Sequence, residues 1–134
     1  MKSYSKYLLI ATTVFFGLLG IVLIFLPDEL LVYYEIENHP MLALLCQLAG
    51  AIHFAIAMLN WMNKEKVIGG IYNRPLAVTN FTYLFIAGIS AFKYVMGVGE
   101  ITSLVGVLTA IYLLLGLLYL RLLFTHPLPA DSKE

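Results

Sequence analysis

The second long apolar segment of this chain carries its small and polar residues at alternating spacings of four and three. These residues are Cys46, Gly50, His53, Ala57, Asn60 and Lys64. On a helix this spacing places them in one stripe. His53 lies halfway along the segment, where a neutral imidazole could relay protons or accept a hydrogen bond from a ligand. The alternative is a structural hydrogen bond between His53 and a hydroxyl of a neighbouring helix, that of Thr13, Thr82 or Tyr83.

The third apolar segment carries a second polar stripe, made of Asn80, Tyr83, Ala87, Ser90 and Tyr94. If the two segments are antiparallel neighbours, Asn60 and Asn80 lie at the same depth, where their amides bond each other or line a small polar cavity. Lys93 is one turn from the end of its segment and either extends to the surface, towards Glu100 or the acidic loop before residue 40, or binds a ligand. The candidate ligand or pore residues are therefore His53, Asn60, Asn80, Tyr83, Ser90 and Lys93.

Other chemistry finds little support in the sequence. Glu35, Glu37 and His39 alternate and could face one cation on an extended backbone, but three ligands at this spacing form a weak motif. Cys46 is the only cysteine, which excludes an internal disulfide and a paired-cysteine redox site. The chain has no glycine-rich phosphate loop, nucleophile elbow or HExxH motif. We therefore predict no catalytic residue, no metal site and no cofactor.

The elements that must position these side chains are membrane spans. Four apolar segments, about 7–26, 41–62, 76–96 and 101–124, each have the roughly 20 residues needed to cross a bilayer core of about 30 Å as a helix. Of the 134 residues, 61% are apolar and 12% charged, so the chain could not cover a water-facing surface. The prediction is an all-α, polytopic membrane protein, a four-transmembrane-helix up-down bundle that forms one membrane domain over 1–134.

Basic and acidic residues lie on opposite sides of the predicted membrane spans. The N-terminal tail, the middle loop and the C-terminal end contain the basic residues Lys2, Lys6, Lys64, Lys66, Arg74, Arg121 and Lys133. The other two connections contain Asp28, Glu29, Glu35, Glu37 and Glu100. By the positive-inside rule both termini are cytoplasmic. The first segment lacks a small-x-small cleavage site, so we expect it to stay as an uncleaved span of a multi-pass protein in the inner (plasma) membrane.

Small residues indicate where the helices approach one another. Thr13, Gly17 and Gly20 form one smooth face of the first span, and Gly106 with Ala110 forms a small-xxx-small pair in the fourth. Pro27 ends the first span and begins a short helix over 28–34. The connection at 97–100 is tight, so the third and fourth spans should be antiparallel neighbours. Prolines 127 and 129 end the fourth span, and the tail beyond is expected to be disordered.

The middle loop has the most distinctive sequence. Asn60-Trp61-Met62-Asn63-Lys64 is followed by Gly69-Gly70-Ile71-Tyr72-Asn73-Arg74-Pro75. The two glycines permit a reversal of the chain, Asn73 is a possible helix cap, and Pro75 suits a first helical turn. With the four-span layout, this loop resembles that of small uncharacterised bacterial membrane proteins, and the size and layout resemble the DoxX-like group.

The resemblance implies a four-helix bundle of the bacterial inner membrane and transfers no catalytic residue. It makes Asn60, Trp61, Arg74 and Pro75 the loop positions to test, the alternative being that they only anchor the hairpin at the cytoplasmic interface.

Three classes of function remain open. The first is a structural or accessory protein that binds membrane lipids, further copies of itself or another membrane protein, but no nucleic acid. The second is a small oligomeric transporter or channel that uses the polar faces of the second and third spans; no span holds a buried Asp or Glu for proton coupling. The third is a membrane enzyme, which lacks any recognisable catalytic group. We predict the first.

Overall fold

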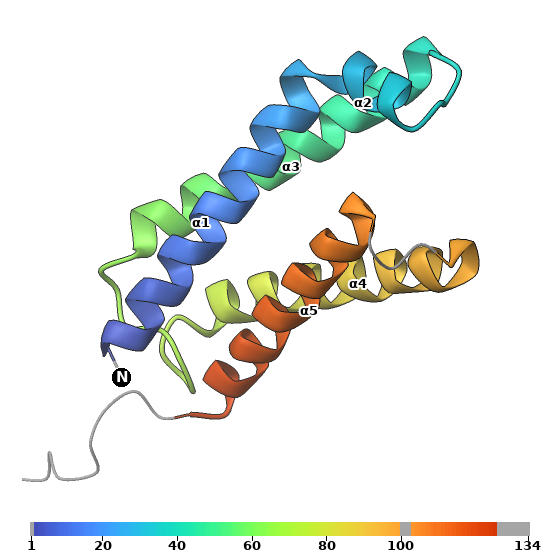
Figure 1. The fold of residues 1–134 in the computed structure, drawn as a ribbon. Helices are drawn as coiled ribbons and strands as arrows, with labels where there is room; N and C mark the ends of the chain where they lie inside the picture. Colours follow the sequence, from blue (N-terminus) through green and yellow to red (C-terminus); the bar gives the residue numbers. More distant parts are fainter. Residues whose placement is uncertain (1, 100–102, 126–134) are drawn as a thin grey trace, which may run out of the picture. The chain divides into compact units, whose positions relative to one another are not determined.

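The protein is all-helical, as predicted. A computed structural model describes residues 2–99 and 103–125, which form five α-helices (Figure 1). They are α1 (Lys2–Phe25), α2 (Pro27–Tyr33), α3 (Pro40–Asn63), α4 (Arg74–Val98) and α5 (Leu104–Leu123). The chain divides into two compact units, Leu9–Glu65 and Met1–Leu8 with Lys66–Glu134.

Four of the described helices, α1, α3, α4 and α5, are long and apolar enough to cross a membrane. In each, only 17% to 28% of the most apolar stretch is buried, so most of the apolar side chains face outward. A water-soluble protein rarely exposes so much contiguous apolar surface, whereas hydrocarbon accepts it. The prediction of four helices that are long and apolar enough to span a membrane is confirmed.

A side-chain cap defines the start of the fourth long helix. α5 begins at Leu104 because the Ser103 hydroxyl oxygen accepts a hydrogen bond from the Gly106 backbone N–H at 3.2 Å, which satisfies one of the unpaired donors of a helix start. The helix ends at Leu123, before the prolines. Prolines 127 and 129 and the tail lie outside the described residues.

In the unit Leu9–Glu65, α1 and α3 are in direct contact through small residues. An added Cβ at Gly20 would lie 2.9 Å from the backbone nitrogen of Phe54, and one at Gly50 would lie 2.9 Å from the Gly20 carbonyl oxygen. The Thr13 hydroxyl donates to the carbonyl of Leu9 at 2.8 Å and lies 3.3 Å from that of Ala57. The predicted small-residue face of the first span is therefore confirmed as a helix contact.

In the other unit, α4 and α5 pack as antiparallel neighbours (Figure 1). Gly88 faces Leu113, and Gly116 faces Leu84, so residue numbers rise along one helix as they fall along the other. The close approach in α4 is at Gly88, a position that sequence reasoning did not single out. The predicted antiparallel hairpin of the third and fourth spans is confirmed.

Three segments of this unit meet at one end. The Ser5 hydroxyl, in the first turns of α1, donates to the carbonyl of Ile68 at 3.1 Å. The backbone N–H of Gly70 donates to the Leu122 carbonyl at the end of α5. The start of α1, the loop over 66–73 and the end of α5 thus lie on the same side.

Candidate functional site

The polar stripe predicted for the second span is the buried face of α3. The buried residues of this helix are Gly50, His53, Ala57 and Asn60. Cys46 and Lys64, at the two ends of the predicted stripe, are half-buried. The four–three spacing alone identified this face correctly, because helix geometry sets which residues share a side.

His53 lies deep in this face, with 5% of its surface exposed. Its Nδ1 is 2.7 Å from the carbonyl oxygen of Ala49, one turn earlier. Since a carbonyl can only accept, Nδ1 carries the proton, and in the neutral ring Nε2 is the acceptor nitrogen. The edge of the ring meets Phe16 of α1 at 5.5 Å between centroids and 75°. At Nδ1 the partner is therefore His53's own helix, and not the hydroxyl of a neighbouring helix.

The two candidate amides are fully buried. Asn60 and Asn80 both have 0% of their surface exposed. The Asn80 side-chain nitrogen donates to the carbonyl of Leu76 at 2.9 Å, again one turn earlier. That the two amides lie at equal depth, bonded to each other or beside a cavity, stays a prediction.

The predicted stripe of α4 does not coincide with the packed face of that helix. Its buried residues are Leu76, Ala77, Asn80, Leu84, Gly88 and Val95. Of the polar stripe only Asn80 belongs to this set; Tyr83 is half-buried, while Ser90 and Tyr94 are exposed. The hydroxyl-bearing side therefore flanks the packed face, because the large apolar residues and Gly88 determine which side packs on α5.

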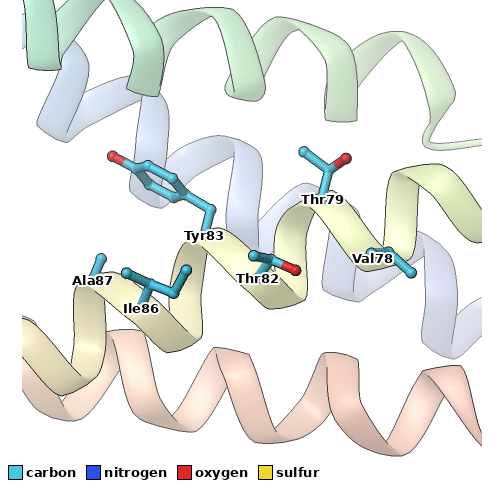
Figure 2. A pocket seen from close by; sticks show the side chains of 6 residues that line it. All are labelled: Val78, Thr79, Thr82, Tyr83, Ile86 and Ala87. Carbon is cyan, nitrogen blue, oxygen red and sulfur yellow. The ribbon is translucent and has the colours of Figure 1, made fainter.

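A broad, open hollow of about 520 Å³ lies on the flanking side of α4 (Figure 2). The lining side chains are Val78, Thr79, Thr82, Tyr83, Ile86 and Ala87. Three of them carry hydroxyls, which can donate and accept hydrogen bonds, but none carries a charge. From the sequence, Thr82 was considered only as a possible hydrogen-bond partner of His53.

Lys93 is exposed near the end of α4, as expected for a lysine that extends to the membrane surface. Its predicted partner Glu100 lies outside the described residues. The pairing of these two residues, and a ligand for Lys93, stay predictions.

The loop residues Trp61, Arg74 and Pro75 are all exposed. The Lys64 ammonium lies 2.9 Å from the centroid of the Trp61 ring, a cation–π contact at the end of α3. Pro75 lies in the first turn of α4, as predicted. Asn73 is at the cap position, but its side chain makes no cap bond, which corrects the expected role. It donates instead to the carbonyl of Val67 at 2.7 Å and closes the loop.

Asn73 also has a left-handed backbone, with φ 45°. Asn73→Ala should lower the stability by about 1–2 kcal/mol, because it adds left-handed strain and removes the bond to Val67. Asn73→Gly should lose less, because glycine accepts this φ. Thermal melting in detergent measures both variants, and equal losses would contradict a role for the backbone conformation.

The acidic loop does not have the geometry assumed for cation binding. Glu35 is left-handed, with φ 54°, so the alternation from Glu35 to His39 does not follow an extended backbone. His39 caps α3, its Nδ1 accepting from the Met41 backbone N–H at 3.2 Å. Within the ranges 2–99 and 103–125, no group of three or more His, Cys, Asp or Glu side chains is placed to hold a metal ion.

Comparison with known proteins assigns no relative. Neither a protein-family model, nor a curated protein, nor a solved structure matches this chain.

Proposed function

We propose that this chain is a non-catalytic membrane protein, a structural or accessory helical bundle that binds lipids or a protein partner in the bilayer. The proposal rests on the hydrogen bonds that polar side chains inside the long apolar helices make to the backbone of their own helix. The side chains of Thr13, His53, Asn80 and Thr109 each bond the backbone carbonyl four residues earlier. A side chain bonded in this way is accommodated in an apolar surrounding without needing a ligand.

The proposed orientation has both termini in the cytoplasm of a bacterial cell, with the chain in the inner membrane. Its support is the charge bias, together with the side shared by the start of α1, the loop over 66–73 and the end of α5. Lys6, Lys66 and Arg121 belong to these segments, and Arg74 follows the loop directly as the first residue of α4. We also propose that the chain is related to the DoxX-like group. Its proposed partners are membrane lipids, a second copy of the chain or another membrane protein.

A small oligomeric transporter or channel is the second candidate. The hydroxyls of Thr79, Thr82 and Tyr83 in the hollow of α4 support it, because uncharged hydroxyls can replace part of the hydration of a passing solute.

Substitution of the buried polar residues separates the two functions. We expect His53→Ala and Asn80→Ala to lower the stability in detergent by about 1–3 kcal/mol, because each removes a bonded, packed side chain. Ser90→Ala is the matched control, since Ser90 is exposed on α4, and its melting temperature should equal that of the wild type.

The functional measurement uses vesicles loaded with a pH-sensitive dye. Proteoliposomes with the wild-type protein should show the same proton leak as protein-free vesicles. A protein-dependent flux that disappears in His53→Ala or Tyr83→Phe, with melting unchanged, would overturn the accessory function in favour of transport.

A further inference from the structure

A small polar cavity lies where the first turns of α1 meet the end of α5. It has a volume of about 220 Å³ and is lined by Tyr4, Ser5, Arg121, Leu122 and Thr125. Such a volume is below the roughly 300–1,000 Å³ of pockets for drug-sized ligands. It suits a single compact group.

The carbonyl oxygens around this cavity already have donors. The Tyr4 hydroxyl lies 3.4 Å from the Leu118 carbonyl, and the Thr125 hydroxyl donates to that of Arg121. The Leu122 carbonyl accepts from the backbone N–H groups of Gly70 and Thr125. The C-terminal end of a helix normally repels an anion. Here the carbonyls of Leu118, Arg121 and Leu122 accept hydrogen bonds from within the protein, which reduces that repulsion.

Arg121 supplies the charge. Among the residues that the structure describes, none forms an ion pair with its guanidinium, which is exposed at the edge of the cavity. A guanidinium offers five donors in a planar fork that matches the oxygens of a phosphate.

An apolar strip continues from Arg121 along α5. Leu117 and Leu114 lie four and seven residues earlier, on the same side of the helix, and are 62% and 59% exposed. Val107 and Ala110 extend this exposed strip at the same spacing. A headgroup held at Arg121 could therefore place an acyl chain along α5.

We propose that this cavity binds a phosphate oxyanion, and that the strip on α5 makes a glycerophospholipid its source. The proposal deepens the accessory function above and rests on its lipid-binding form. Arg121 contacts the phosphate, while Tyr4 and Thr125 keep the nearby carbonyls occupied.

Native mass spectrometry of the full chain in detergent tests the site, with dioleoyl phosphatidylglycerol as the probe. Arg121→Gln should weaken binding of the first lipid about tenfold or more, the loss expected for one charge-assisted pair. Arg121→Lys, which keeps the charge but not the fork, should fall between. Arg74→Gln removes the same charge from an exposed site outside the cavity and should change binding less than about twofold.

Two further probes identify the source of the phosphate. Dioleoylglycerol has the same acyl chains without the phosphate and should not bind at this site. Inorganic phosphate is the second probe. If it displaces the lipid at millimolar concentration and, without any lipid, binds as tightly as the lipid does, free phosphate is the ligand and the assignment to a lipid is overturned.

The outcomes also separate this proposal from the function on which it rests. The cavity would be overturned as a site if Arg121→Gln and Arg74→Gln weakened lipid binding equally, with unchanged melting temperatures, or if neither weakened it. Lipid binding elsewhere on the protein would then still support the accessory function. A wild-type protein that binds no lipid and conducts protons would overturn both.

Discussion

Replacing Gly20 by alanine is expected to lower the stability of the protein by about 1–3 kcal/mol, the usual cost of overpacking. The new Cβ would lie 2.9 Å from the backbone nitrogen of Phe54 and 3.0 Å from the carbonyl oxygen of Gly50. Backbone atoms cannot turn aside as a side-chain end can, so α1 and α3 must separate. In an exposed helix the same change would gain about 1 kcal/mol from helix propensity. A loss of stability in Gly20→Ala therefore indicates the close contact of α1 and α3, whereas a gain would indicate an exposed position.

The control for Gly20→Ala is Gly97→Ala. Gly97 is also helical, but among residues 2–99 and 103–125 no atom outside its own helical turn lies within 4 Å of an added Cβ, so this variant should be unchanged or slightly more stable. Unfolding of both variants by a denaturing detergent, followed by circular dichroism, measures the difference. If the two variants changed stability by the same amount and sign, the close contact of α1 and α3 would be contradicted.

Gly69→Ala is expected to have the second large effect, a loss of about 2–3 kcal/mol. Gly69 has φ +132°, a conformation that residues with a Cβ rarely adopt. An added Cβ would also lie 3.2 Å from the carbonyl oxygens of Leu122 and Thr125. The loop over 66–73 would have to move from the end of α5, so the Gly70 amide should also lose protection from hydrogen exchange.

Gly99→Ala separates the two causes. Gly99 has φ +78°, and no atom of the described part of the chain lies within 4 Å of an added Cβ, so alanine there should cost about 1 kcal/mol of left-handed strain alone. A melting temperature of Gly99→Ala at or below that of Gly69→Ala would show that the contact with α5 contributes nothing.

The features that sequence reasoning predicted correctly follow from two strong constraints. Hydrocarbon requires long apolar helices, and the helical period decides which residues share a side. The buried face around His53 and the contact at Gly20 could therefore be predicted from spacing alone. Which residues share a side is a property of one helix at a time.

The features that it missed depend on a partner distant in the chain. The stripe through Tyr83 and Ser90 has a helical spacing as regular as that around His53, but the residues facing α5 decide which side of α4 is packed. Asn73 was expected to cap α4. Whether its side chain bonds the start of that helix or the carbonyl of Val67 depends on how the loop closes. Nothing near Ser5 in the sequence indicates that its hydroxyl will donate a hydrogen bond to the carbonyl of Ile68.

The bond between Ser5 and Ile68 has a consequence for assembly. Its partners are 63 residues apart, and those of the Tyr4 contact with Leu118 are 114 apart. Chain synthesis delivers α1 to the bilayer long before α5 has left the ribosome. Ser5 can therefore form its bond only once the loop over 66–73 has been made, and Tyr4 its contact only once α5 has been made, so the first turns of α1 reach these native contacts well after α1 itself has been synthesised.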